Sequence, residues 1–175
     1  MLRHALLALA CAASICVSAP AAGAPAVHSA NVLEGKVIHV ADGDTITMLL
    51  EDRTQVKIRF SGIDAPEKGQ AWGQRSRQSM SSLAAGRYAR AYVGKRDRYG
   101  RSVALVTVDG RDVGLEQLRR GMAWTYTRYL NELPYREQRL YLEAESEARA
   151  ARRGLWSDPR PQEPWDWRRH KREGR

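Results

Sequence analysis

The sequence predicts an α+β fold that is mainly β, with five short strands and three helices. Two observations lead to this prediction. Runs rich in β-branched residues alternate with Asp-Gly and Tyr-Gly turn signals over residues 33–63 and 88–108. Three further stretches carry apolar residues at helical spacing, and a glycine lies near the end of each: Gly86, Gly121 and Gly154. The length of 175 residues suits one compact domain with appendages.

The first three strands lie on either side of two turns. Asp42–Asp44 interrupts the first run, and Glu51–Arg53 turns the chain after the second. The third run alternates apolar and polar residues, which is the period of a half-buried strand and directs Arg59 away from the core. These predicted strands are Lys36–Val40, Thr45–Leu50 and Val56–Ser61.

A helix and two more strands are predicted next. Within Gly73–Ala85, apolar and small residues recur at roughly helical spacing, and Gly86 is a natural stop. The two strands flank the turn Asp97–Arg101, and an Asp-Gly turn closes the second of them. They are Tyr88–Val93 and Ser102–Val108.

The C-terminal third predicts two further helices and a tail. The short helix holds Leu115, Leu118 and Met122 on one side, and the long helix runs from about Pro134 to Arg153. The buried stripe predicted for the long helix is Tyr141, Ala144, Ala148 and Ala151. The tail from Gln162 to Arg175 is rich in Trp, Arg and Lys without periodicity, so we expect an ordered anchor at Trp165 and Trp167 and a flexible basic end.

Five short strands with interspersed helices are compatible with a small closed barrel of the OB type. Local propensity alone does not favour that barrel over another α+β sheet. The strand pattern therefore leaves two folds open, a five-stranded OB barrel with three helices and another α+β sheet.

The first 26 residues have the pattern of a secretory signal rather than of the fold. A short basic start precedes the apolar run Ala5–Val17, which is too short to span a bilayer, and a stretch rich in Ala, Pro and Gly follows. We expect an exported protein, periplasmic or extracellular, with an uncleaved anchor as the alternative. Both cysteines, Cys11 and Cys16, lie in this segment, so the mature chain has no thiolate chemistry and no disulfide. A lipoprotein cleavage site at Cys11 fits poorly, because the leucine before it is one place too close.

The net charge of +9 favours polyanionic partners. Nucleic acid is the first such partner, an anionic membrane surface is the rival, and solubility alone would also account for the charge. The membrane interpretation is weak because no predicted helix sets bulky apolar residues opposite its charges.

Two acidic turns supply the residues for chemistry. Asp44, Asp64 and Glu67 are hard oxygen ligands without a cysteine nearby, which favours Ca²⁺ or Mg²⁺ over zinc. Arg59 and Arg101 are planar cations of the kind that hold phosphate in a bidentate way. Each acidic segment alone is an ordinary turn, and each arginine alone an ordinary surface charge. Their combination makes phosphodiester chemistry the leading hypothesis.

These residues also sit in motifs that closely resemble the staphylococcal nuclease (thermonuclease) family, in the family's order over residues 33–157. The motifs are Asp42–Thr45, Ile58–Glu67, Asp97–Arg101, Leu118–Trp124 and Gly154–Trp156. The resemblance implies an OB barrel with three helices and a nuclease that uses one Ca²⁺ ion on DNA and RNA and leaves 3′-phosphate ends. Together with the signal pattern, it predicts a chain organised as a signal peptide (1–26), a linker (27–32), a nuclease-like domain (33–157) and a tail (158–175).

By motif position, the resemblance assigns a role to each site residue. Asp44, Asp64 and the backbone carbonyl of Ala65 would bind the ion. Arg59 and Arg101 would grip the phosphate, and Glu67 would orient or deprotonate the attacking water. The supporting residues would be Asp42 and Thr45 for the metal loop and Tyr99 and Tyr129 for the substrate.

One departure from the family pattern falls after the second helix. The family has a pair of tyrosines there, whereas this chain has Thr127 and Tyr129, with Tyr126 adjacent. Stacking on an exposed aromatic tolerates such changes, so we expect altered end-binding rather than lost catalysis. Tyr99 could instead pack on the barrel as a turn aromatic.

The rival function is a nucleic-acid-binding OB module without catalysis. Such a module has no physical need for a carboxylate cluster, which repels phosphate unless a cation is bound. We therefore expect a monomeric enzyme with DNA and RNA as substrates, no obligate protein partner and no stable membrane insertion.

Overall fold

The computed structural model describes residues 31–174. The predicted signal peptide and most of the predicted linker lie outside the described residues. The first strand already begins at Asn31, so the barrel starts two residues before the predicted domain boundary.

Five strands form a closed barrel, as the family resemblance implied. The sheet has the strand order β3-β2-β1-β5-β6-β7, and a parallel pairing of β3 with β6 closes it. All other pairings in this sheet are antiparallel. The strands of this sheet are β1 (Asn31–Val40), β2 (Thr45–Leu50), β3 (Gln55–Phe60), β5 (Tyr88–Arg96), β6 (Ser102–Val108) and β7 (Arg111–Asp112).

The alternation predicted for the third strand is present. Ile58 and Phe60 are buried in the barrel, whereas Lys57 between them is exposed. The barrel interior is filled by β-branched and unbranched side chains that have almost no exposed surface, among them Ile46, Met48, Ile58 and Val106. Burial of these apolar groups stabilises the fold, because each fully buried side chain contributes on the order of 2 kcal/mol.

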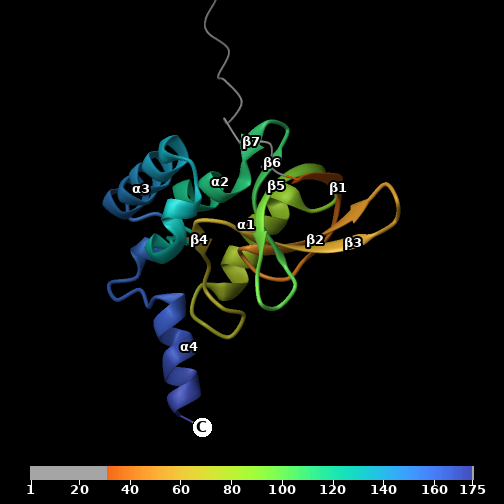
Figure 1. Ribbon diagram of the computed structural model, residues 1–175. Helices are drawn as coiled ribbons and strands as arrows, with labels where there is room; N and C mark the ends of the chain where they lie inside the picture. The colour runs from red at the N-terminus through yellow and green to blue at the C-terminus, as the bar shows by residue number, and fades with distance from the viewer. Residues whose placement is uncertain (1–30, 175) are drawn as a thin grey trace, which may run out of the picture.

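Three helices pack on the barrel in the predicted order, and Figure 1 shows α3 and α2 together at one side of it. Most of the predicted apolar positions are buried, among them Met80 and Ala84 in α1, Leu118 in α2, and Tyr141 and Ala144 in α3. Met122 and Ala151 are not buried, and they lie beyond the ends of α2 and α3. The long helix ends earlier than predicted. The bounds are α1 (Gly73–Ala84), α2 (Val113–Arg119) and α3 (Tyr135–Ala150), with 3₁₀ turns η1 (Thr127–Glu132) and η2 (Gly154–Ser157).

A second, smaller sheet and a tryptophan cluster join the helices to the barrel. Strand β4 (Ile63–Asp64) pairs antiparallel with β8 (Trp124–Thr125). Trp124 and Trp156 then pack edge to face, with ring centroids 4.3 Å apart. Where the chain returns after α3, Gly121 has φ +64° and a Cβ there would lie 2.1 Å from the Arg153 carbonyl oxygen, so this close approach requires glycine.

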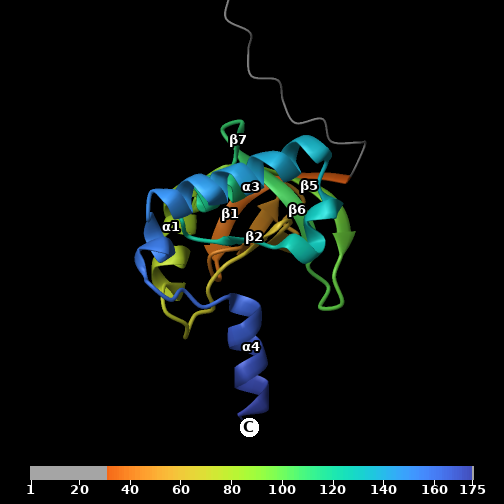
Figure 2. The same ribbon diagram turned by 90° about the vertical axis from the view of Figure 1, so that its left-hand side faces the viewer.

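The prediction for the tail was wrong in part. The segment forms a fourth helix, α4 (Pro164–Glu173), rather than a flexible end. It starts with proline at its first turn and has basic residues in its last turn, both of which favour a helix. Figures 1 and 2 show α4 projecting from the rest of the molecule. Between residues 31 and 174, no helix combines the length and apolar character that a membrane span requires.

Candidate active site

A cleft of about 1240 Å³ opens between the barrel, η1 and the start of α4. The sequence-predicted residues gather in it, since all of them except Thr45 line its wall. These are Asp42, Asp44, Arg59, Asp64, Ala65, Glu67, Tyr99, Arg101 and Tyr129. The cleft therefore brings together side chains from four separate segments of the sequence.

The β1–β2 turn presents Asp44, which is almost fully buried. Its Oδ2 accepts a 2.6 Å hydrogen bond from the Ala65 N–H, which ties the first acidic turn to the second. Its Oδ1 accepts from the Thr45 hydroxyl at 3.0 Å, and its own N–H donates to Asp42 Oδ1 at 3.0 Å. Asp42 and Thr45 thus hold the loop and the carboxylate in place.

Arg59 joins the two acidic turns. It follows Ile58 on β3, and its guanidinium lies 2.7 Å from Asp44 Oδ1 through Nη1 and 2.7 Å from Asp64 Oδ1 through Nη2. Nη1 also donates to the Ile63 carbonyl at 3.1 Å. Its side chain is only 13% exposed, so these are charge-assisted bonds in a partly dry environment.

The electrostatics of this group favour a cation. Burial raises the pKa of Asp44 to about 7, although the positive charge of Arg59 opposes the shift. Burial also raises the pKa of Asp64; the hydrogen bond from Arg168 opposes this shift, and the negative charge of Asp44 adds to it. Two buried carboxylates that disfavour each other's ionisation are stabilised by positive charge between them.

Glu67 lies on the loop after β4. Its backbone N–H donates to Gln70 Oε1 at 3.1 Å, and the Gln70 side chain donates to the Gln162 carbonyl at 2.6 Å. The Glu67 carboxylate remains 38% exposed, which leaves it accessible to water. The loop that carries Glu67 is thereby tied to the segment just before α4.

Arg101 enters the cleft from the β5–β6 turn. Asp97 holds it, accepting from Arg101 Nε at 2.7 Å and from the backbone N–H groups of Arg101 and Tyr99 at 3.0 and 2.9 Å. The Arg101 side chain is 28% exposed and has no contact with Asp44 or Asp64 among the described residues. Sequence reasoning quoted Asp97 in its motif but gave it no role, whereas the geometry makes it the residue that orients Arg101.

The two predicted tyrosines line the cleft from different segments, the β5–β6 turn and η1. Tyr99 is 69% exposed, so it does not pack on the barrel as a turn aromatic would. Tyr129 is part of η1 and packs edge to face against Tyr126 at 5.0 Å. Tyr126, for which no role was predicted, lines the cleft together with Thr127 and stacks on Trp165 of α4.

Sequence reasoning missed the residues that hold the first acidic turn from behind. Gln117 Nε2 donates to the Gly43 carbonyl at 2.8 Å and to the Ser76 carbonyl at 3.2 Å, which ties the turn to α1 and α2. A Cβ on Gly43 would lie 1.8 Å from Ser76 Oγ, so the turn packs too closely for another residue. The available signal was a glutamine one turn after Val113, on the buried face of a short helix.

Arg168 of α4 is a second missed residue. Its Nη2 lies 2.6 Å from Asp64 Oδ2, and its Nη1 donates to Asp64 Oδ1 at 3.1 Å and to Glu67 Oε1 at 2.8 Å. Partial burial works against its charge, but the hydrogen bond to Asp64 and the carboxylate charges hold its pKa above the usual range of arginine. No hydrophobic pattern marks this residue, and its contacts span about a hundred positions of sequence.

The oxygen donors of the cleft fit a hard divalent cation that takes only a few of its ligands from the protein. Within residues 31–174 there is no group of three or more His, Cys, Asp or Glu side chains arranged to hold a metal. Two carboxylates, Asp44 and Asp64, converge on one guanidinium instead, with the backbone of Ala65 beside them. An all-oxygen set of this size leaves coordination positions for water and phosphate, as Mg²⁺ and Ca²⁺ sites do.

Comparison with known proteins agrees with this geometry. A sequence model of the family described as "Staphylococcal nuclease homologue" matches residues 57–158. A protein named micrococcal nuclease from Shigella flexneri is 37% identical over 174 residues, which cover 94% of this chain and 92% of that protein.

Two proteins named uncharacterized endonuclease are similar over slightly shorter stretches. The one from Haemophilus influenzae is 38% identical over 137 residues, covering 78% of this chain and 74% of that protein. The one from Escherichia coli O157:H7 is 42% identical over 142 residues, covering 79% and 87%. The matching motifs, the closed barrel and the cleft agree with one another, and the chain belongs to the staphylococcal nuclease family.

Proposed function

We propose that the protein is a nuclease that hydrolyses phosphodiester bonds of DNA and RNA with the help of one Ca²⁺ ion and leaves 3′-phosphate ends. One observation supports this most directly: Arg59 bridges Asp44 and Asp64 inside a cleft whose other side carries Arg101. The carboxylates suit a divalent cation and the arginines suit a phosphate. A nucleic acid with a bound divalent cation brings both.

The arginines would bind and stabilise the reacting phosphate. A phosphodiester gains negative charge on its nonbridging oxygens during hydrolysis, and planar guanidinium groups match that charge with two parallel N–H donors. Arg59 is held on β3 by buried contacts and Arg101 by Asp97, so both are oriented before the substrate arrives. Such preorganisation avoids reorganising the site during the reaction.

Glu67 would orient the attacking water and accept its proton. Its carboxylate is the more exposed of the acidic groups beside Asp64 and faces the same cleft. Asp44, Asp64 and the Ala65 carbonyl would hold the ion, which when bound supplies a Lewis acid for a phosphoryl oxygen. The Thr45 and Asp42 contacts would keep Asp44 in position.

Cleavage assays on plasmid DNA and on a structured RNA test this proposal. We expect cleavage with Ca²⁺, none with excess chelator, and a loss of about 10²-fold or more in Glu67→Gln, on the scale of general-base catalysis. Glu132→Gln is the matched control, since it removes the same charge from the same cleft without touching Asp64. Mass spectrometry of the products of a short oligonucleotide then identifies the terminal phosphate.

The outcomes separate the nuclease from the alternative, a binding module without catalysis. Full cleavage in excess chelator would contradict the metal mechanism. Tight binding without cleavage under any divalent ion would favour the binding module, for which the cationic cleft alone would be sufficient.

We further propose that the protein is exported to the periplasm or the medium and acts there as a monomer. The signal-like pattern of residues 1–26 supports export. Intact-mass measurement of the protein recovered from fractionated cells checks it. A full-length chain in the cytoplasmic fraction would contradict export.

A further inference from the structure

Helix α4 turns one continuous face toward the active-site cleft. Trp165, Arg168, Arg169 and Arg172 all line the cleft. They stand at positions i, i+3, i+4 and i+7, which fall on a single side of an α-helix. The face therefore consists of one aromatic residue at the base and three arginines along the next two turns.

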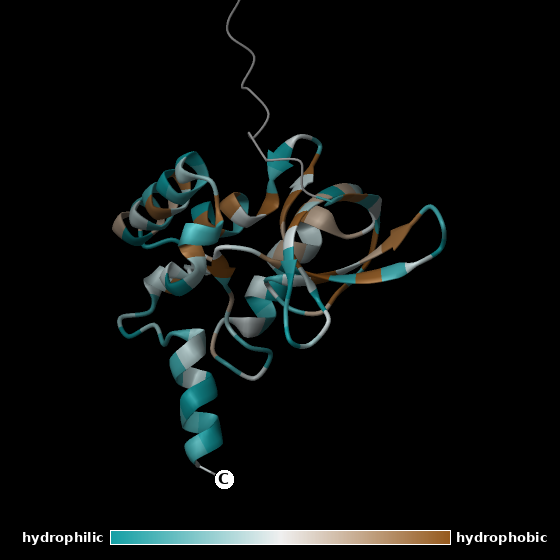
Figure 3. Ribbon diagram, in the orientation of Figure 1, coloured by the Kyte–Doolittle hydropathy of each residue, from teal (hydrophilic) through white to brown (hydrophobic). Residues whose placement is uncertain are grey.

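Aromatic packing anchors the first turn of the helix. Trp165 stacks on Tyr126 with ring centroids 5.5 Å apart and planes 4° apart, and it meets Trp124 edge to face at 6.0 Å. Pro164 is the buried residue of the helix. Beyond this anchor α4 is hydrophilic along its length and projects from the body, as Figure 3 shows. The part of the helix beyond the anchor does not add to the hydrophobic core, so core packing does not account for its row of arginines.

Arg168, the first arginine on this face, reaches the second acidic turn in the cleft. Arg168 contacts both Asp64 and Glu67, the residues that the proposed function gives to the ion and to the water. Arg169 lies one position further and pairs with Asp166 on its own helix at 3.0 Å, an exposed pair of little strength. Among the residues described, Arg172 has no carboxylate within ion-pair distance.

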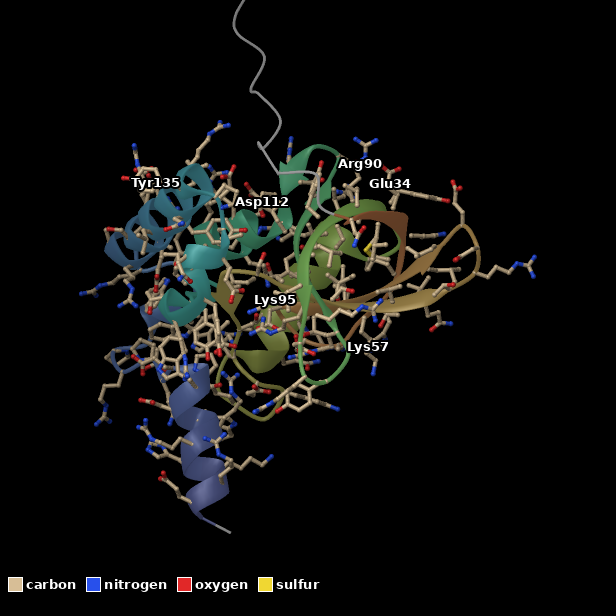
Figure 4. All side chains as sticks on the ribbon, in the orientation of Figure 1. Glu34, Lys57, Arg90, Lys95, Asp112 and Tyr135 are labelled. Atoms are coloured by element: carbon tan, nitrogen blue, oxygen red, sulfur yellow. The ribbon has the colours of Figure 1, made fainter. Side chains whose placement is uncertain are left out.

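The cleft as a whole is suited to a polyanion longer than one phosphate. Ten lysines and arginines line it, against six aspartates and glutamates. Lys57, Lys95 and Arg98 line it from β3, β5 and the β5–β6 turn, and Lys95 is paired with Glu132. In Figure 4, Lys57 and Lys95 lie toward α4, whereas the Arg90–Glu34 pair lies at the other end of the barrel. Cations on both walls would contact successive phosphates of a strand.

We propose that α4 is the second wall of a nucleic-acid groove, in which Arg168, Arg169 and Arg172 bind phosphates of the strand beside the scissile phosphate. This inference rests on the proposed function for its substrate class. Arg168 exchanges its carboxylate partners for a phosphate when substrate enters, and Arg169 and Arg172 extend the contact outward. At about 1.5 Å per residue, the ten residues of α4 extend the groove by about 15 Å.

The test compares two neighbouring residues that carry the same charge. Arg172→Gln removes a cation from the cleft face, and Lys171→Gln removes one from outside the cleft lining. Binding of a fluorescein-labelled single-stranded oligonucleotide is followed by anisotropy over a series of salt concentrations. The Glu67→Gln background is used throughout, so that binding is measured without cleavage.

We expect Arg172→Gln to weaken binding several-fold and to reduce the slope of log K against log[salt] by about 0.7, the loss of one phosphate contact. Arg169→Gln should behave alike, and Lys171→Gln should leave the slope nearly unchanged. Vesicles with anionic lipid should not distinguish Arg172→Gln from Lys171→Gln, because the face carries no bulky apolar side beyond Trp165.

Three results would overturn the inference. Equal slopes for Arg172→Gln and Lys171→Gln would mean that α4 contributes only diffuse charge. Tighter binding by Arg169→Gln and Arg172→Gln would mean that α4 blocks the cleft. A difference on vesicles without one on the oligonucleotide would make α4 a lipid-binding helix. Binding is measured apart from cleavage, so none of these results decides the chelator and Glu67→Gln tests of nuclease activity.

Discussion

At the scale of single residues, Arg59 combines a structural role with the proposed catalytic one. Two buried carboxylates, Asp44 and Asp64, depend on its charge, and the proposed mechanism depends on its planar shape. Removing one partner of a buried charge network leaves the others unpaired, which destabilises a protein by roughly 3–5 kcal/mol. Loss of activity in Arg59→Ala would therefore have two causes that the rate alone cannot separate.

Arg59→Lys separates them. The lysine keeps the charge beside Asp44 and Asp64 but cannot offer two parallel N–H donors. We expect a stability close to wild type in urea unfolding and a loss of cleavage rate of about 10²-fold or more, the scale of a lost preorganised donor. Arg59→Ala should lose both stability and rate. A near-normal rate for Arg59→Lys would show that the phosphate is gripped elsewhere.

The residues at the front of the site could be predicted because they lie in short local motifs. The sequence placed Asp44, Arg59, Asp64 and Glu67 in one site, and the cleft holds them together. Gln117 could not be assigned, because its partner Gly43 lies 74 positions away and is met only through the fold. Arg168 was missed for the same reason.

At the scale of elements, Asp112 joins α2 to α3. It caps α2, accepting from the Leu115 N–H at 3.1 Å, and it accepts from the Tyr141 hydroxyl at 2.9 Å. Burial raises its pKa to about 6, although these hydrogen bonds oppose the shift. The folded state thus retains a proton between about pH 4 and 6 that the unfolded chain, with the ordinary aspartate pKa of about 3.9, has released.

The predicted consequence is that Asp112 makes the protein less stable as pH rises. Its contribution is most favourable below about pH 4, falls as pH rises to about 6 and is level above that, with a total change of roughly 3 kcal/mol. Asp112→Asn keeps a capping oxygen but cannot ionise. We expect the stability of wild type relative to Asp112→Asn to fall by that amount between pH 4 and pH 7, measured by urea unfolding at each pH. A difference that is constant with pH would show that Asp112 is ionised normally.

The elements that sequence reasoning found are those with apolar periodicity. The five barrel strands and the helices α1, α2 and α3 each bury a face that the pattern marks. The face of α4 has the same helical spacing, at Trp165, Arg168, Arg169 and Arg172, but three of the four residues are cations. A search for apolar stripes does not detect such a helix, and only Pro164 and the basic last turn indicated it.

At the scale of the whole molecule, the closure of the barrel is a long-range property. The antiparallel neighbours follow from short turns, but β3 and β6 pair in parallel across more than forty positions. No local pattern specifies that pairing, so strand propensity left another sheet open and the family resemblance pointed to the barrel. Closure also brings the second acidic turn and the β5–β6 turn to one cleft, so the site exists only in the closed barrel.

Removal of α4 should weaken substrate binding while the barrel still folds. Deletion of residues 164–175 takes away one buried residue, Pro164, and the stacking of Trp165 on Tyr126, but no strand of the barrel. The deletion also removes Arg168 from the buried Asp64, so we expect cooperative unfolding to persist with a loss of roughly 3–5 kcal/mol, the scale of one lost partner in a buried charge network. Oligonucleotide binding should weaken far more than this stability loss explains, because three cleft arginines leave together.

Urea unfolding and anisotropy on the same preparation check both parts of this prediction. Trp165→Ala is the control, because it removes the anchor while keeping the arginines. If α4 needs its anchor to form the wall, Trp165→Ala should bind almost as weakly as the deletion. Loss of the cooperative unfolding transition on deletion would instead show that the barrel needs α4 in order to fold.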